Sequence, residues 1–192
     1  ETPTGHAPAV VVPVPVAPSG PAGARDIAAL TYAADPAKKG LDRVLAAWAG
    51  ARRGEEELVV AGLRADHPAA VPAAGVRYAG LLEREAYRAL VRRARVYVTA
   101  PRREDHGIAQ LEALADGAML VTTAAPGPYA ALPIARALDP RLVGDDLGGA
   151  LRAALDDPAP DYAARAAVLL EPFTEEAAVA QTAAALARLL PA

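Results

Sequence analysis

The sequence predicts an α/β domain with a doubly wound parallel sheet of about six strands, helices on both faces and a helical C-terminus. From residue 26 onward, short apolar runs alternate with stretches whose apolar residues recur at helical spacing. Alternating elements of this length are typical of parallel sheets. Right-handed crossovers then make the Rossmann-like strand order 3-2-1-4-5-6 the most economical topology.

The expected strands are short apolar runs, and two of them end at a glycine. Between the second and third strands, residues 64–74 contain Pro68 and Pro72, which favour a loop or one broken helical turn. The expected strands are residues 27–32, 57–61, 76–79, 95–99, 119–123 and, at the sheet edge, 142–143.

The expected helices lie between and after these strands. In the first, Leu41, Val44 and Trp48 recur at helical spacing and should form the buried face. Thr174 precedes two acids, which predicts a capped N-terminus for the last helix. The expected helices are residues 41–52, 83–94, a helix opening at 107 or 108, 129–138, a helix from 145 or 146 to 155, 162–170 and 175–190.

Composition excludes several classes of function. The net charge is −3, aromatic residues make up 4% of the 192 residues, and no basic stripe is evident, so nucleic acid and anionic membranes are poor partners. The absence of cysteine excludes a disulfide framework and a zinc ribbon. Helix capping explains Asp145 and Asp146 more simply than metal binding does. No apolar run is long enough for a transmembrane segment and no basic signal sequence opens the chain, so we expect a cytoplasmic protein.

The first 25 residues differ in composition from the rest. Prolines at positions 13, 15 and 18 allow at most an edge strand or an extended linker. We therefore divide the chain into a Pro-rich linker or tail, residues 1–25, and a Rossmann-like domain, residues 26–192. A disordered tail and a linker to a preceding domain are both compatible with this composition.

The stretch 100–117 lies between the fourth and fifth expected strands and holds the main functional motif. A helix that opens at Gly107 leaves its first N–H groups without intrahelical partners, and those groups favour an anion. Gly107 also has no Cβ, so a ligand can approach the backbone closely. Glu104 precedes this helix and Glu112 lies about one turn into it, so both carboxylates can line one pocket.

Glu104 and Glu112 enclose seven residues, and the run 104–117 resembles the Glu-x7-Glu signature of retaining GT-B glycosyltransferases, most closely glycosyltransferase family 4, the group 1 family. The resemblance spans roughly residues 26–157. It implies that the first Glu contacts the donor sugar and the second holds the ribose of the nucleotide. The amides around Gly107 would hold the sugar and the diphosphate.

The run departs from the family pattern at two positions. Asp105 stands where the family has Gly, and His106 stands where it has Phe, which bears on the choice of sugar. His106 is interpreted as a donor-sugar contact or a satisfied loop histidine, with a general base as a further reading. Leu81 and Leu82 follow the third strand, where the resemblance places the apolar wall of the base site.

The family also has an Arg just after the first strand and a Lys immediately before a Gly, which together hold the donor phosphates. Lys39 matches the Lys. Ala33 stands where the Arg is expected, so half of this clamp is missing, and Lys38 or Arg103 are candidates to compensate. Positive charge there would stabilise the departing nucleotide.

The resemblance therefore implies the donor-binding C-terminal half of an enzyme that transfers a sugar from a nucleoside diphosphate sugar to an acceptor, without a metal. The N-terminal, acceptor-binding domain would be missing, so residues 1–192 alone should bind donor weakly and turn over poorly. The assigned catalytic residues are Glu104 and Lys39, and the donor-binding residues are His106, Gly107, Ile108, Glu112, Leu81 and Leu82.

Three other readings keep an α/β fold. The first is a non-catalytic nucleotide-sugar-binding module, which the alanine at position 33 favours. The second is a GT-B-like epimerase acting on a sugar nucleotide, which no residue specifically favours. The third is a flavodoxin-like interaction domain, which predicts no affinity for nucleotides.

Overall fold

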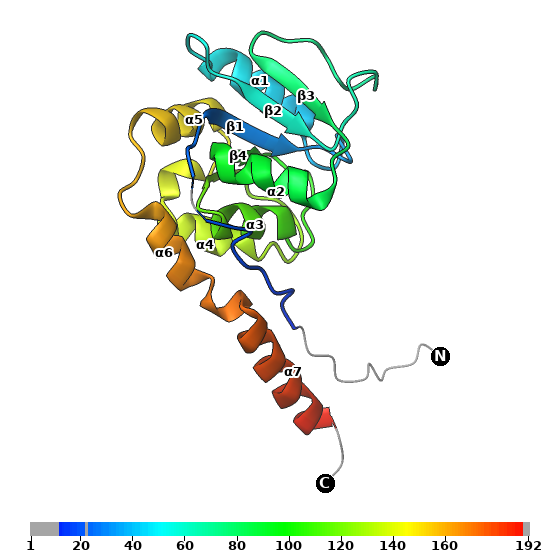
Figure 1. Cartoon of the computed structure of the whole chain (residues 1–192), viewed down its shortest axis with the longest axis vertical. Helices are drawn as coiled ribbons and strands as arrows, with labels where there is room; N and C mark the ends of the chain where they lie inside the picture. The colour runs from blue at the N-terminus through cyan, green and yellow to red at the C-terminus, as the bar shows by residue number, and fades with distance from the viewer. Residues whose placement is uncertain (1–11, 22, 190–192) are drawn as a thin grey trace.

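The computed structural model describes residues 12–21 and 23–189. Nearly half of the expected linker, residues 1–11 and 22, and the last position of the final expected helix, 190, lie outside the described residues. One parallel sheet runs in the order β3-β2-β1-β4-β5 (Figure 1). Its strands are β1 (Ile27–Tyr32), β2 (Leu58–Ala61), β3 (Val76–Gly80), β4 (Ala94–Thr99) and β5 (Met119–Thr122).

Apolar sequence and burial agree in the centre of the sheet. β2 and β5 are buried along their whole length, and β1 and β4 at all but one residue each, as expected for strands covered on both faces. β3, at one edge, is only half-buried. β1 pairs with β2 on one side and β4 on the other, so the chain reverses its direction of winding between these two neighbours. The predicted order is confirmed for five strands.

The expected sixth strand, residues 142–143, is wrong. Leu142 belongs to a short 3-10 helix, η1 (Pro140–Leu142), and Val143 forms only an isolated parallel bridge to Thr122. The side chain of Asp139 accepts a hydrogen bond from the Arg141 N–H at 3.0 Å. Pro140 has no N–H to give to a strand ladder. These two residues wind the segment into a turn just where it would have joined the sheet edge.

Helices cover both faces of the sheet (Figure 1). α1 and α5 pack against each other and contact β4, while α2 contacts β1 and β4 on the other side, and α3 packs on β5. The helices are α1 (Leu41–Ala51), α2 (Arg84–Arg93), α3 (Ile108–Ala115), α4 (Ala131–Leu138), α5 (Leu147–Asp156), α6 (Tyr162–Leu169) and α7 (Glu175–Leu189), with a second 3-10 helix, η2 (Glu171–Phe173).

The C-terminal helices lead away from the sheet, and α7 projects from the body of the domain (Figure 1). Thr174 caps α7 as predicted, since its Oγ1 accepts a hydrogen bond from the Ala177 N–H at 3.2 Å. Within the described part of the chain, none of the helices combines the length and the apolar character needed to cross a membrane.

The N-terminal segment lies along the domain and forms no strand in residues 12–21 or 23–25. The Val16 N–H donates to the Phe173 carbonyl at 2.8 Å. Arg25 donates to the carbonyls of Ala94 and Asp116, both at 2.5 Å. The segment is therefore fixed by hydrogen bonds at both ends.

Candidate functional site

A cavity of about 600 Å³ opens beyond the carboxyl ends of β1 and β4, where ligands bind on open parallel sheets. The loops that follow these strands meet here, because the Arg102 N–H donates to the Lys38 carbonyl at 2.9 Å. All eight residues that the sequence assigned to catalysis or donor binding line this cavity. The lining residues are Tyr32, Lys39, Gly62, Leu81, Leu82, Arg84, Tyr87, Glu104, Asp105, His106, Gly107, Ile108, Ala109 and Glu112.

Glu104 is the most buried acid of the site, with 4% of its surface exposed. Its Oε2 accepts hydrogen bonds from the Lys39 Nζ at 2.8 Å and the Gln110 Nε2 at 2.9 Å. Burial acts to raise the pKa of Glu104, but these hydrogen bonds and the charge of Lys39 outweigh it and hold the pKa below its ordinary value. The carboxylate is thus charged at neutral pH.

The Glu104 backbone is fixed by the loop after β5. Its N–H donates to the Pro126 carbonyl at 3.0 Å. Gly127 has a φ of 111°, and a Cβ there would lie 2.3 Å from the Glu104 carbonyl oxygen. Only glycine fits so close to another backbone. The loop after β5 therefore packs against the loop after β4, and the two loops jointly fix the position of the Glu104 carboxylate.

The N-terminus of α3 forms another wall of the cavity. Gly107, the residue before the helix, has a left-handed φ of 86°, and no side chain caps the helix. A Cβ on Gly107 would lie 2.8 Å from the Tyr129 ring, so the position requires glycine. An uncapped helix N-terminus with its amides at a cavity is suited to an anion.

Glu112 faces the same cavity from one turn along α3. Its Oε1 accepts a hydrogen bond from the Arg88 Nη1 at 3.0 Å and lies 3.6 Å from the Arg84 Nη2. No hydrogen bond within the described residues engages its Oε2. One oxygen is therefore held from behind and the other is available to a ligand.

Neither of the two cations that the sequence offered in place of an arginine at position 33 lines the cavity. Ala33 is fully buried at the end of β1. Lys38 and Arg103 both pair with Asp105, at 2.8 and 2.9 Å, and neither lines the cavity. The cation that does line it, besides Lys39, is Arg84 at the start of α2, whose side chain is 80% exposed.

His106, Leu81 and Leu82 also line the cavity. The Nε2 of His106 is buried and has no hydrogen-bond partner in the described part of the chain. Its ring stands edge-on to Phe173, with centroids 6.3 Å apart. Leu81 is 70% exposed, so its apolar surface is open to a ligand.

Sequence reasoning missed several lining residues. Tyr32 ends β1 and Tyr87 lies on α2, and their rings pack at 5.3 Å between centroids on one side of the cavity. Burial raises the pKa of the Tyr87 hydroxyl, so it is neutral. Helical spacing predicts that Tyr87 faces inward, but it does not predict that Tyr87 lines this cavity. Gly62, Arg84 and Ala109 also line the cavity and were not assigned to it from the sequence, whereas Asp105 was noted only as a departure from the family pattern.

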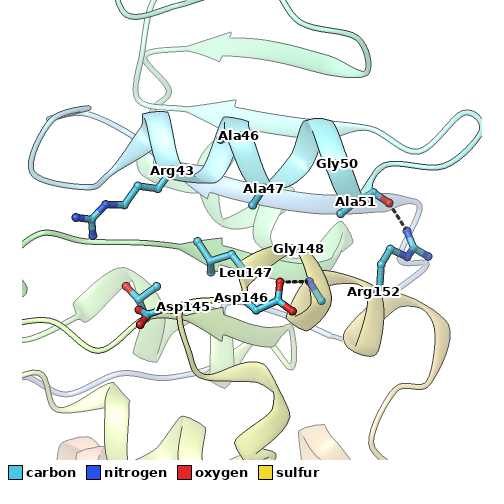
Figure 2. A pocket seen from close by; sticks show the side chains of 12 residues that line it. Arg43, Ala46, Ala47, Gly50, Ala51, Asp145, Asp146, Leu147, Gly148 and Arg152 are labelled. Carbon is cyan, nitrogen blue, oxygen red and sulfur yellow. Dashed lines mark hydrogen bonds between the residues drawn. The ribbon is translucent and has the colours of Figure 1, made fainter.

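A second, larger cavity of about 790 Å³ lies between α1 and α5 (Figure 2). Small residues such as Ala47 and Gly148 form much of its wall. Arg152 reaches across to the Ala51 carbonyl at 3.2 Å, as Figure 2 shows. Asp146 caps α5, as predicted, by accepting from the Gly149 N–H at 2.9 Å. The described residues contain no group of three acids or histidines suited to a metal ion.

Comparison with solved structures shows a shared fold. The structure resembles that of a sucrose-phosphate synthase from Thermosynechococcus elongatus, with 20% identity, a TM-score of 0.65, and coverage of 93% of this chain and 50% of that one. It also resembles HepE from Anabaena, solved in complex with UDP and glucose, with 13% identity, a TM-score of 0.67, and coverage of 85% and 49%. The chain spans about half the length of these proteins. No curated protein matches the sequence.

A protein-family model then gives the family. Residues 26–157, more than half of the chain, match the family described as Glycosyl transferases group 1. The chain belongs to this family, and its fold is that of a C-terminal domain of a GT-B glycosyltransferase.

Proposed function

We propose that this chain is the donor-binding domain of a retaining glycosyltransferase, which takes a sugar from a nucleoside diphosphate sugar. The observation that carries the proposal is the convergence of Glu104, Lys39, Glu112 and the amides at Gly107 on one cavity at the switch point of the sheet. Supporting it, HepE, which has a similar fold, was solved with UDP and glucose.

The four features take separate roles in this proposal. Lys39 and the N-terminus of α3 meet the negative charge of the diphosphate as it departs, without a metal ion. Glu104 orients hydroxyls of the sugar, and Glu112 accepts from the ribose hydroxyls. In the free protein Lys39 and Glu104 form an ion pair. When the donor binds, this ion pair is replaced by two contacts, from Lys39 to the diphosphate and from Glu104 to the sugar. Catalysis then comes from positioning and electrostatics.

Two leucines and a histidine complete the donor site in the proposal. Leu81 and Leu82 cover the face of the base, for which the exposed side chain of Leu81 is suited. His106 and the backbone at Ile108 contact the sugar and the diphosphate. The acceptor is bound by a further domain, and residues 1–192 alone bind donor weakly and turn over poorly.

Calorimetric titration with UDP, GDP and ADP tests the proposal. We expect at least one to bind, and Glu112→Gln, which keeps the shape of the side chain, to weaken it about tenfold through the lost charged hydrogen bond. Asp145→Asn is the matched control, because this exposed acid lines the cavity between α1 and α5. No binding of any of the three nucleotides would contradict the proposal.

One observation favours a second function, a non-catalytic nucleotide-sugar-binding or interaction module. Ala33 supplies no cation, and Lys38 and Arg103 are both paired with Asp105. An assay of the full-length protein separates the two, with radiolabelled sugar donors and a panel of acceptors. Tight nucleotide binding without any sugar transfer or donor hydrolysis would favour the module.

A further inference from the structure

Arg88 joins three parts of the molecule that are distant in the sequence. Its Nη1 donates to Glu112 Oε1 at 3.0 Å, its Nε to Asp116 Oδ2 at 2.9 Å, and its Nη2 to the Ala17 carbonyl at 2.9 Å. Only 4% of Arg88 is exposed. Each of its three nitrogens therefore has a partner, as a buried guanidinium requires.

Asp116, one of the partners of Arg88, also binds the N-terminal segment. Asp116 Oδ1 accepts from the Ser19 N–H at 2.7 Å, and Oδ2 accepts from the Ser19 hydroxyl at 2.9 Å. Arg92, one turn after Arg88 on α2, donates to the Ser19 hydroxyl at 2.6 Å. Ser19 is the only serine in the chain. The segment Ala17–Ser19 thus shares one hydrogen-bond network with Arg88, and Arg88 carries that network to Glu112.

Packing alone does not fix the Glu112 carboxylate. Glu112 lines the cavity beyond β1 and β4, here called the donor cavity, and also a smaller one of about 320 Å³ that Pro15–Ser19 help to line. The side chain therefore has open space on two sides. Its shortest charged contact is the bond from Arg88 to Oε1, at 3.0 Å against 3.6 Å for Arg84, and this bond leaves Oε2 for a ligand.

We propose that Arg88 is a positioning residue that orients Glu112 toward the ribose hydroxyls, and that the segment Ala17–Ser19 holds Arg88 in place. Donor affinity then depends on how the residues before the domain are anchored. This inference rests on the proposed donor-binding function. Arg88 does not line the donor cavity and acts through Glu112.

The ratio of affinities for a ribonucleotide and its 2′,3′-dideoxy form tests this role, because it reports the ribose hydroxyls alone. We use whichever of UDP, GDP and ADP the wild type binds best. The wild type should prefer the ribose form about tenfold, as a charged hydrogen bond allows. In Arg88→Met that preference should nearly vanish, while affinity for the dideoxy form stays within about twofold.

Two further variants extend the test along the network. Ser19→Ala should lower the ribose preference by about twofold to threefold, as the loss of an ordinary hydrogen bond at one remove would. Arg93→Met is the matched control, since Arg93 lies on the same helix but pairs with exposed Asp26, at 2.6 Å. It should keep the full preference. If Arg88→Met does not fold, Ser19→Ala and Arg88→Lys decide, and an unchanged preference in both overturns the inference.

The outcomes separate this inference from the proposed function. If the wild type binds none of the three nucleotides, the donor-binding function and the role of Arg88 both fail. A wild type that prefers the ribose form, with the same preference in Arg88→Met, overturns the role of Arg88 alone. If Arg88→Met weakens both forms equally, Arg88 is merely structural, and the inference again fails.

Discussion

The cavity beyond β1 and β4 and the cavity between α1 and α5 differ in how their charged groups are held. In the larger cavity between the helices, Arg152 bonds to the end of α1 and Asp146 caps its own helix, so these charges serve the packing of α5. In the donor cavity beyond β1 and β4, Lys39, Glu104 and Glu112 come from separate elements and converge on open space. Convergence of charge from distant segments identifies a candidate site better than volume does.

A pair of glycines gives the largest expected contrast. Gly107→Ala forces a left-handed φ on alanine and drives its Cβ into Tyr129, which should cost about 2–4 kcal/mol of folding free energy and abolish nucleotide binding. Gly148→Ala meets only ordinary contacts inside α5, so it should stabilise the fold by about 0.5–1 kcal/mol and leave binding unchanged. Urea unfolding and calorimetry measure both. Equal effects of the two substitutions would remove the distinction between the cavities.

The charge of Glu104 in the donor cavity predicts that the stability of the fold depends on pH. Glu104→Gln should cost about 1.5 kcal/mol near neutral pH, because a charged hydrogen-bonded group is lost. Since the pKa of Glu104 in the folded protein lies below its ordinary value of about 4.3, this difference should be complete above that value and disappear as the pH falls through the lower pKa. Urea unfolding of both proteins across the acidic range measures it. A constant difference at all pH values would contradict the ion pair.

The smallest effect concerns one exposed arginine from each cavity. Arg84→Ala should weaken nucleotide binding about twofold to fivefold, as an exposed ion pair allows, and the loss should shrink at high salt. Arg43→Ala, in the cavity between the helices, should change nothing. Calorimetry at two salt concentrations checks both. An equal loss of nucleotide affinity in the two variants would show a general charge effect with no preference for the donor cavity.

Much of the sheet could be predicted because its strands are buried on both faces and read as unbroken apolar runs. The contact between Glu104 and Lys39 has a topological reason, since the loops after β1 and β4 share one edge of the sheet. The predicted strand at residues 142–143 was wrong because two apolar side chains fit a strand, while Asp139 and Pro140 direct the backbone into a 3-10 helix.

Arg88 could not be predicted from its surroundings. It lies in a helix rich in arginine, where a solvated face is the ordinary interpretation, and buried arginines are rare. Its partners, Ala17 and Asp116, are 71 and 28 residues away in the sequence. Only the folded chain brings them together, so the support behind Glu112 had no local pattern to reveal it.

The hydrogen bonds of Ser19 and Arg25 have a practical consequence for anyone who wishes to produce the domain by itself. The family match begins at residue 26, and a shortened gene would naturally start there. Such a protein would lack Ser19, whose N–H donates to the Asp116 carboxylate, and Arg25, which donates to the Asp116 carbonyl. Expression should therefore begin upstream of Val16, whose N–H donates to the Phe173 carbonyl at 2.8 Å.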